Sequence, residues 1–418
     1  EMKIDLVLQN ENWIKPLCCG QGWSSDAKGG VGAHDNGICW ANGVQGFREY
    51  AICCHGRLRQ LAAARAPPWM AAEIRSDIAH WRGKKLRRVD LDRFEAPARG
   101  KFCRFRVVKG KLVTCEPRTL ELCKGGPGSE PYGQFEAAAR ASRILLELGL
   151  LPRNADFYVS VDLYDQSEQP VPVITKARAV FTPGFLRMPS YELVGPLLDK
   201  LRHEVSRTTW SEKEPRLYWR GGMRSFNSCQ CGGHIPGRAE WPARWRKFNG
   251  STLLEMAATA PQPGGGRLPL TPRCHCQAHW TNSSTFKRNN RIRLCELSRQ
   301  FPQLIDAKLA YIPDSYDSIR QRLLDLGYAA EFSQKTEQTK YKYLISTDGS
   351  TIDDTRIYWM LSTGSIIFKQ ITPLLPYGIP GLVPWEHFVP IREDMSDLVE
   401  KIRFAQANDD SMKQIALR

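Results

Sequence analysis

Short apolar runs separated by polar and glycine-containing turns mark the last third of the chain. Residues 341–347 are an apolar and aromatic run of strand length, and residues 348–350 (Asp-Gly-Ser) follow as a turn signal. Apolar residues at helical spacing predict a helix over residues 353–363, and β-branched residues predict a second strand over 365–371. This strand–helix–strand unit would present backbone N–H groups of the kind that bind phosphate.

The same alternation extends over most of the chain. Outside the unit above, a hairpin is predicted over 102–114 and strands over 157–161, 216–219 and 304–312. Helices are predicted over 70–80, 136–148, 191–204, 286–301, 319–326 and 396–408. Strands and helices that alternate in two sets predict an α/β fold with two domains facing a cleft.

The predicted domain boundary lies in a polar stretch near residues 205–212. We expect an N-terminal domain over 1–208, which begins with a Cys-rich segment. A C-terminal domain over 209–395 would carry an insertion at 226–283, where Gly, Pro, Trp and Arg cluster. Residues 396–418 form a final helical segment.

Polar residues follow two of the predicted strands at their carboxyl ends. Asp162 and Asp165 come directly after strand 157–161, and Arg220 ends strand 216–219. Ligands of open α/β sheets bind just beyond the carboxyl ends of the strands. The guanidinium of Arg220 is suited to phosphate, and the glycines after it let the backbone approach a ligand. A structural salt bridge is the alternative role for Arg220.

The formal charge of +15 leaves several partners open. Basic residues concentrate in segments 84–106 and 287–293. They are typical of a solvated basic face, and the alternatives are a site for a nucleotide-sugar pyrophosphate, an anionic glycan or a membrane surface. The sequence has no helix-turn-helix, RNA-recognition or standard zinc-finger pattern, so nucleic acid is disfavoured.

Thirteen cysteines indicate an oxidising compartment, because a cytosolic enzyme of 418 residues rarely carries so many. Four of them form two C-x-C pairs, Cys229/Cys231 and Cys274/Cys276, with histidines nearby. Zinc binding and structural disulfides are both open for these pairs, although the spacing is tighter than in common zinc sites.

Glycosylation sequons at Asn249 and Asn282 agree with a lumenal protein. The chain has no run of about 18 apolar residues and no signal-like segment at Glu1. A signal or membrane anchor, if there is one, would lie outside this sequence.

Several motifs together resemble the core signature of glycosyltransferase family 90. They are KYKYLI-x-x-DG from Lys340, an Arg that opens a helix, a GS-hydrophobic strand, PG-L-x-PW-x-H before residue 388, and Leu-Tyr-Trp-Arg-Gly at 217–221. The family contains protein O-glucosyltransferases and capsule xylosyltransferases. The resemblance is strongest over residues 300–410, and it implies two Rossmann-like domains of the GT-B type.

The resemblance implies that Arg220 and Arg356 contact a nucleotide-sugar donor. The full set of donor-binding candidates is Arg220, Gly221, Gly349, Ser350, Thr351, Arg356, Lys369 and His387. A core or structural role is the alternative for His387. The loop between Gly349 and Arg356 is one residue longer than the family pattern, and Asp353 and Asp354 replace small hydroxyl residues in it.

The family's catalytic Asp follows the strand that corresponds to 157–161, but no Asp stands in perfect register here. Asp162 is one position early and Asp165 is two late, so both stay candidates for the base. The resemblance also implies that Cys115 pairs with Cys123 and that the last helix packs toward the first domain.

The resemblance implies an inverting glycosyltransferase that moves xylose or glucose from a UDP-sugar to a hydroxyl of a protein Ser, an N-glycan or a polysaccharide. We expect no cofactor and no metal, because arginines and helix ends carry the charge in two-Rossmann transferases. The predicted location is the lumen of the Golgi or endoplasmic reticulum. The alternatives are a non-catalytic glycan-binding protein on the same fold and a zinc-stabilised interaction protein.

Overall fold

The computed structural model describes the following parts of the chain. They are residues 68–84, 87–95, 102–115, 151–160, 170–175, 177–179, 185–187, 203–205, 208–223, 289–312, 317–349, 354–372, 374–376 and 381–417, with a few positions between 135 and 149. The predicted Cys-rich start and the insertion at 226–283 lie outside these residues.

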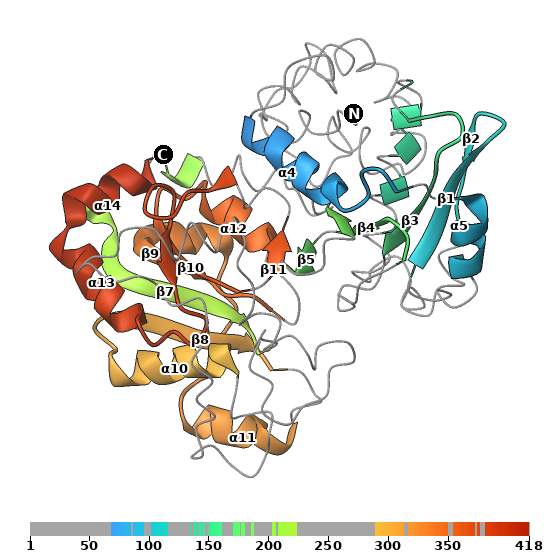
Figure 1. Cartoon of the computed structure of the whole chain (residues 1–418). Helices are drawn as coiled ribbons and strands as arrows, with labels where there is room; N and C mark the ends of the chain where they lie inside the picture. Colours follow the sequence, from blue (N-terminus) through green and yellow to red (C-terminus); the bar gives the residue numbers. More distant parts are fainter. Residues whose placement is uncertain are drawn as a thin grey trace, which may run out of the picture. The chain divides into compact units, whose positions relative to one another are not determined.

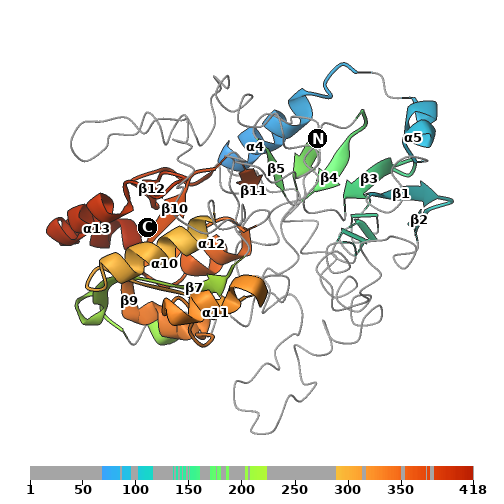
Figure 2. The same ribbon diagram turned by 90° about the horizontal axis from the view of Figure 1, so that it is seen from below.

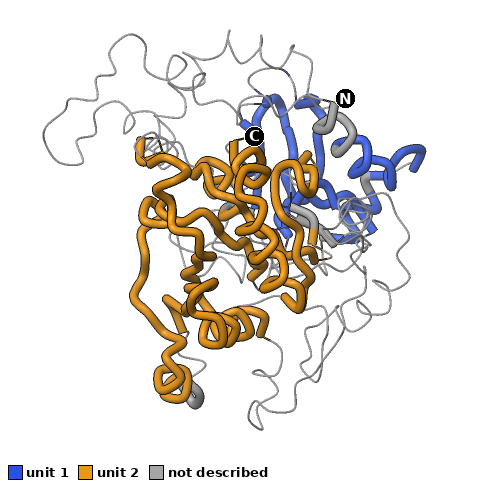
Figure 3. Tube along the Cα trace, turned by 90° about the vertical axis from the view of Figure 1, so that its left-hand side faces the viewer, with its two compact units in different colours: residues 1–163, 169–175, 184–186 blue, residues 164–168, 176–183, 187–418 orange. Residues whose placement is uncertain are grey.

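The chain divides into two compact units, which Figure 3 colours separately. The first comprises residues 1–163, 169–175 and 184–186, and the second comprises the rest. Each unit contains a five-stranded sheet with parallel strand pairs, which confirms the predicted α/β class. The GT-B arrangement of two Rossmann-like domains and the boundary at 208/209 stay predictions.

The first unit is built on a mixed sheet of order β2-β1-β3-β4-β6 (Figure 1). The strands are β1 (Phe102–Val108), β2 (Lys111–Val113), β3 (Asp156–Ser160), β4 (Val173–Thr175) and β6 (Phe185–Arg187), and the helices are α4 (Pro68–Ala79) and α5 (Arg88–Glu95). The predicted hairpin is confirmed, with its turn at Lys109 and Gly110, both at positive φ.

Ion pairs of the buried Arg104 join α5 to this sheet. The guanidinium of Arg104 on β1 contacts Asp156 on β3 at 2.7 Å and Asp92 on α5 at 2.6 Å. The phenol of Tyr158 donates to the carbonyl of Leu91 at 2.9 Å. The polar groups beside the aromatic and aliphatic core of these elements are thus paired with one another by ion pairs and a hydrogen bond.

The predicted pairing of Cys115 with Cys123 is wrong. Cys115 forms a disulfide with Cys103, across a Cα–Cα distance of 5.6 Å. The hairpin register agrees with this pairing. Arg106 lies opposite Val113, so the same register continued away from the turn would place Cys115 opposite Arg104, the neighbour of Cys103. The expectation of disulfides in this chain is confirmed by this bond.

The second unit has an all-parallel sheet of order β12-β10-β9-β7-β8, visible from two sides in Figures 1 and 2. Its strands are β7 (Glu214–Gly222), β8 (Ile305–Tyr311), β9 (Tyr341–Ser346), β10 (Ile366–Gln370) and β12 (Val389–Ile391). Its helices are η4 (Trp210–Glu212), α10 (Asn290–Gln300), α11 (Asp317–Asp325), η7 (Lys335–Lys340), α12 (Asp354–Met360), α13 (Leu398–Ala407) and α14 (Asp409–Ala416). A separate ribbon pairs β5 (Ala177–Ala179) with β11 (Leu374–Pro376).

The predicted strand–helix–strand unit is confirmed as β9, α12 and β10, with the two strands parallel and adjacent. The end of the chain differs from the prediction of one helix, because α13 ends at Ala407 and α14 begins at Asp409, with Asn408 between them. Both helices bury apolar residues in the core of this sheet, namely Leu398, Ile402, Ala405 and Met412. Packing of the last helix on the first domain stays a prediction.

Candidate functional site

The strand order places a topological switch point between β7 and β9. The chain crosses from β7 through α10 to β8 on one side, and from β9 through α12 to β10 on the other. Doubly wound sheets of this order bind ligands at the carboxyl ends of the two strands where the direction reverses. Here those ends are Gly221–Gly222 on β7 and Asp348–Gly349 after β9.

Arg291, in the first turn of α10, forms hydrogen bonds to both strand ends. Its guanidinium donates to the carbonyl of Gly222 at 2.8 Å, to the carbonyl of Thr347 at 3.1 Å and to the hydroxyl of Thr347 at 3.2 Å. The side chain is buried. Its charge therefore lies at the switch point itself, where it favours an anionic ligand.

The start of α10 is fixed by a side-chain cap. The Oδ1 atom of Asn289 accepts from the backbone N–H groups of Arg291 and Ile292 at 3.0 and 3.1 Å. The cap satisfies these amides within the protein, and the Arg291 side chain carries a full positive charge at the same helix start. From the sequence, Arg291 was expected only as part of the basic segment 287–293, and the Asn cap before it was the signal that could have placed it at a helix start.

Arg356, a predicted donor contact, reaches the end of β7 from the first turn of α12. It is half-buried, and its Nη1 donates to the carbonyl of Arg220 at 3.4 Å. Its guanidinium carbon stands 5.8 Å from the ring centre of Trp219, and that of Arg291 stands 5.6 Å from it. Two arginines, one from α10 and one from α12, thus converge on one buried indole.

Gly221 is needed for this arrangement. A Cβ atom at position 221 would lie 2.5 Å from Cζ2 of Trp219, which is closer than real Cβ contacts come. At Gly222 the nearest atom to an added Cβ is Cδ1 of Tyr311, at an ordinary 3.5 Å. The first glycine therefore makes room for the indole, and the second accepts the hydrogen bond of Arg291.

Lys369 and Asp348 form a buried ion pair beside the same strand ends. Their Nζ and Oδ1 atoms are 3.1 Å apart, and the side chains are 5% and 0% exposed. The hydroxyl of Thr372 also donates to the carboxylate of Asp348. The structure thus places Lys369, a predicted donor-binding residue, against a carboxylate of the protein.

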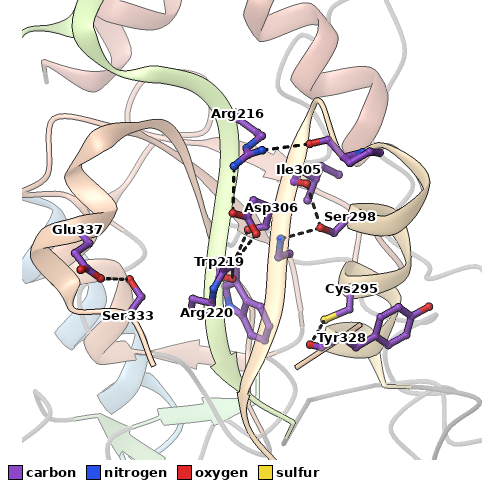
Figure 4. A network of polar contacts seen from close by, with 12 residues as sticks. Arg216, Trp219, Arg220, Cys295, Ser298, Ile305, Asp306, Tyr328, Ser333 and Glu337 are labelled. Atoms are coloured by element: carbon purple, nitrogen blue, oxygen red, sulfur yellow. Dashed lines mark hydrogen bonds and ion pairs between the residues drawn. The ribbon is translucent and has the colours of Figure 1, made fainter. Parts of the chain in front are cut away.

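Arg220 does not point toward the switch point in this structure. Figure 4 shows its guanidinium turned to Asp306 on β8, at 2.9 Å, and Asp306 also holds Arg216 at 3.2 Å. The guanidinium carbon of Arg220 stands 4.4 Å from the ring centre of Tyr218, which stacks on Tyr341. The side chain of Arg220 is thus in a salt bridge, which is the alternative role predicted for it, while its carbonyl accepts a hydrogen bond from Arg356.

His387 lies in the turn before β12. Its Nδ1 accepts from the backbone N–H of Val383 at 2.9 Å, so the ring stabilises its own turn, in which Trp385 has a φ of 64°. This contact agrees with the structural alternative for His387.

Other predicted site residues lie outside the described residues. They are Asp162, Asp165, Ser350, Thr351, Cys123, Cys229, Cys231, Cys274, Cys276, Asn249 and Asn282. Among the residues that are described, no group of three or more His, Cys, Asp or Glu side chains is arranged to hold a metal ion. No helix in the described part is long and apolar enough to cross a membrane.

Comparison with known proteins gives the same family as the motifs. Residues 271–418 match the model of glycosyl transferase family 90, which confirms the predicted resemblance. The chain is 34% identical over 129 residues to protein O-glucosyltransferase 3 of Homo sapiens, covering 31% of this chain and 24% of the relative. It is 29% identical over 188 residues to protein O-glucosyltransferase 1 of Rattus norvegicus, covering 44% of each.

Protein O-glucosyltransferase 2 of Danio rerio is 32% identical over 130 residues, which is 31% of this chain and 25% of the relative. The chain therefore spans between about a quarter and less than half of the length of these relatives. The family match covers α10, β9, α12 and β10, and it includes both arginines at the switch point.

Proposed function

On the premise that residues 271–418 match glycosyl transferase family 90, we propose that this chain is an inverting glycosyltransferase that uses a UDP-sugar. The donor sugar is glucose or xylose, and the acceptor is a hydroxyl on a protein Ser, an N-glycan or a polysaccharide. Three relatives carry the name protein O-glucosyltransferase, which supports a protein acceptor and glucose.

The convergence of Arg291 and Arg356 at the switch point of the second sheet is the observation that carries this proposal. A nucleotide-sugar donor leaves as a diphosphate, and negative charge grows on it while the glycosidic bond breaks. Fixed cations at that position bind the diphosphate and stabilise the charge of the transition state. Arg291 supplies charge from a buried position, and the half-buried Arg356 supplies N–H groups for direct contact.

The acceptor hydroxyl must lose a proton as it attacks the sugar. In an inverting reaction one carboxylate serves as the base and no covalent sugar–enzyme intermediate forms. Asp162 or Asp165 is the proposed base, on sequence grounds. We propose that the reaction needs no metal, since the arginines supply the positive charge, and that it takes place in the lumen of the endoplasmic reticulum or Golgi.

The test is binding of UDP, UMP and uridine to the purified chain and to its Arg356→Ala variant. We expect UDP to bind best, and Arg356→Ala to weaken UDP by about tenfold or more while uridine changes little, because charge-assisted hydrogen bonds are lost. Arg403→Ala is the matched control, because Arg403 is an exposed arginine on α13.

UDP-glucose and UDP-xylose are then compared as donors by release of UDP, with and without EDTA. A chain to which no UDP-sugar binds would contradict the transferase and leave the glycan-binding alternative. A stoichiometric metal whose removal unfolds the chain would favour the zinc-stabilised alternative instead. Equal UDP affinity of the wild type and Arg356→Ala would remove Arg356 from the site.

A further inference from the structure

We propose that Lys369 is a positioning residue, which acts on the donor site through Asp348 and does not itself touch the donor. This inference rests on the proposed function, because it concerns how the same site is held in shape. It assigns Lys369 a different role from the one expected from the sequence.

The contacts of Lys369 are made with the protein. Its Nζ lies 3.1 Å from Oδ1 of Asp348 and 2.8 Å from the carbonyl oxygen of Gln370, and its side chain is only 5% exposed. An ammonium group has three hydrogens, and two of them are directed by these bonds. Asp348 is fully buried, so its negative charge depends on a partner of opposite sign.

The backbone of Asp348 is tied to β10 as well. Its N–H donates to Oε1 of Gln370 at 3.0 Å, and Nε2 of Gln370 donates to the carbonyl of Glu393 at 2.7 Å. The hydroxyl of Thr372 donates to the second carboxylate oxygen. Side chain and backbone of Asp348 are therefore both held by residues at the end of β10 and after it.

This anchoring bears on the donor site because of where Asp348 stands in the chain. It is two residues beyond β9, and the segment that begins there leads to α12, whose third residue is Arg356. The neighbouring Thr347 accepts from Arg291 through its carbonyl and its hydroxyl. Loss of the ion pair would therefore displace the end of β9, which Arg291 contacts directly and from which the chain leads to Arg356.

A double-mutant cycle separates a positioning role from direct contact. Breaking a buried pair by removing one partner leaves an uncompensated charge, whereas removing both is often close to neutral. Lys369→Met alone is expected to raise the Kd for UDP by about tenfold or more. The double variant Lys369→Met/Asp348→Asn is expected to return to within about threefold of the wild type, and so is Lys369→Arg, which keeps the pair.

Direct contact of Lys369 with the diphosphate predicts the opposite result. The double variant would then bind UDP as weakly as Lys369→Met, and that outcome would overturn the proposal, as would an unchanged Kd in Lys369→Met. Urea unfolding of all variants shows whether each one folds. It also gives the coupling free energy between the two positions, independently of UDP binding. If the wild type binds no UDP, the proposed function fails, and additive unfolding changes would then also refute the pair.

Discussion

The guanidinium of Arg220 and the carboxylate of Asp306 stand 2.9 Å apart, on adjacent parallel strands. Asp306 lies directly opposite Tyr218 in the register of β7 and β8, so Arg220 reaches back along its own strand, over the ring of Tyr218. One carboxylate thereby serves two arginines, because Arg216 contacts its other oxygen at 3.2 Å.

Asp306→Asn is expected to destabilise the second unit by about 1–3 kcal/mol, since both part-buried arginines lose a charged acceptor. Urea unfolding measures this change. Asp325→Asn is the matched control, because Asp325 on α11 accepts an exposed hydrogen bond from Gln321, and we expect a change within about 0.5 kcal/mol. If the two variants lose the same free energy of unfolding, the ion pairs of Asp306 do not contribute to stability.

The glycine pair at the end of β7 gives a second test. Gly221→Ala would drive a methyl group into the buried Trp219, and overpacking of this kind costs about 1–3 kcal/mol. Because Arg291 and Arg356 both lie over that ring, UDP binding should weaken in the same variant.

Gly222→Ala is the control for this test, since its added methyl would meet Tyr311 at an ordinary distance and Tyr311 is 58% exposed. Unfolding and UDP affinity should both stay near the wild-type values. Comparable losses in the two variants would show that the effect comes from the loss of glycine at this strand end and not from the indole.

The helices and strands around the site could be predicted from the sequence, because residues close to each boundary determine where it falls. The turn after β9, the glycine after α12 and the alternation of strands and helices are all determined by nearby residues. Arg356 could be placed for the same reason, as an arginine that opens a helix between two parallel strands.

The partners of Arg220 and Lys369 could not be predicted in this way. Each is set by the register between two strands, β7 with β8 and β9 with β10, which is a result of tertiary packing. Strand alternation alone shows which face a side chain occupies, but it does not show which carboxylate lies opposite. The burial of Asp348 is likewise a result of tertiary packing.

The disulfide gives a third prediction, and here the signal was available. A hairpin with its turn at Lys109 and Gly110 brings Cys103 next to Cys115, as the observed register does. Tryptic digestion without reductant should yield peptide 102–104 linked to peptide 112–118, which becomes two peptides on reduction. A link between 112–118 and 119–124 would instead support the pairing of Cys115 with Cys123 implied by the family resemblance.

A buried lysine at the amino-terminal ends of the strands in the second sheet predicts how the free energy of unfolding depends on pH. Lys213 directs its ammonium group at the carbonyls of Thr339 and Thr363 and at the hydroxyl of Ser365. Burial lowers the pKa of Lys213 from 10.5 to about 8. Between pH 8 and 10.5 the unfolded chain therefore holds a proton that the folded chain has released.

Under these conditions the free energy of unfolding rises with pH, because the unfolded state binds more protons than the folded state. Lys213→Met lacks the titrating group, so the stability difference between wild type and variant should grow in favour of the wild type from pH 7.5 to pH 9.5. Urea unfolding at three pH values measures this difference and cancels the contribution of other groups. Parallel profiles for the two proteins would mean that Lys213 keeps the same protonation in both states, and that its ammonium group reaches solvent despite the three contacts.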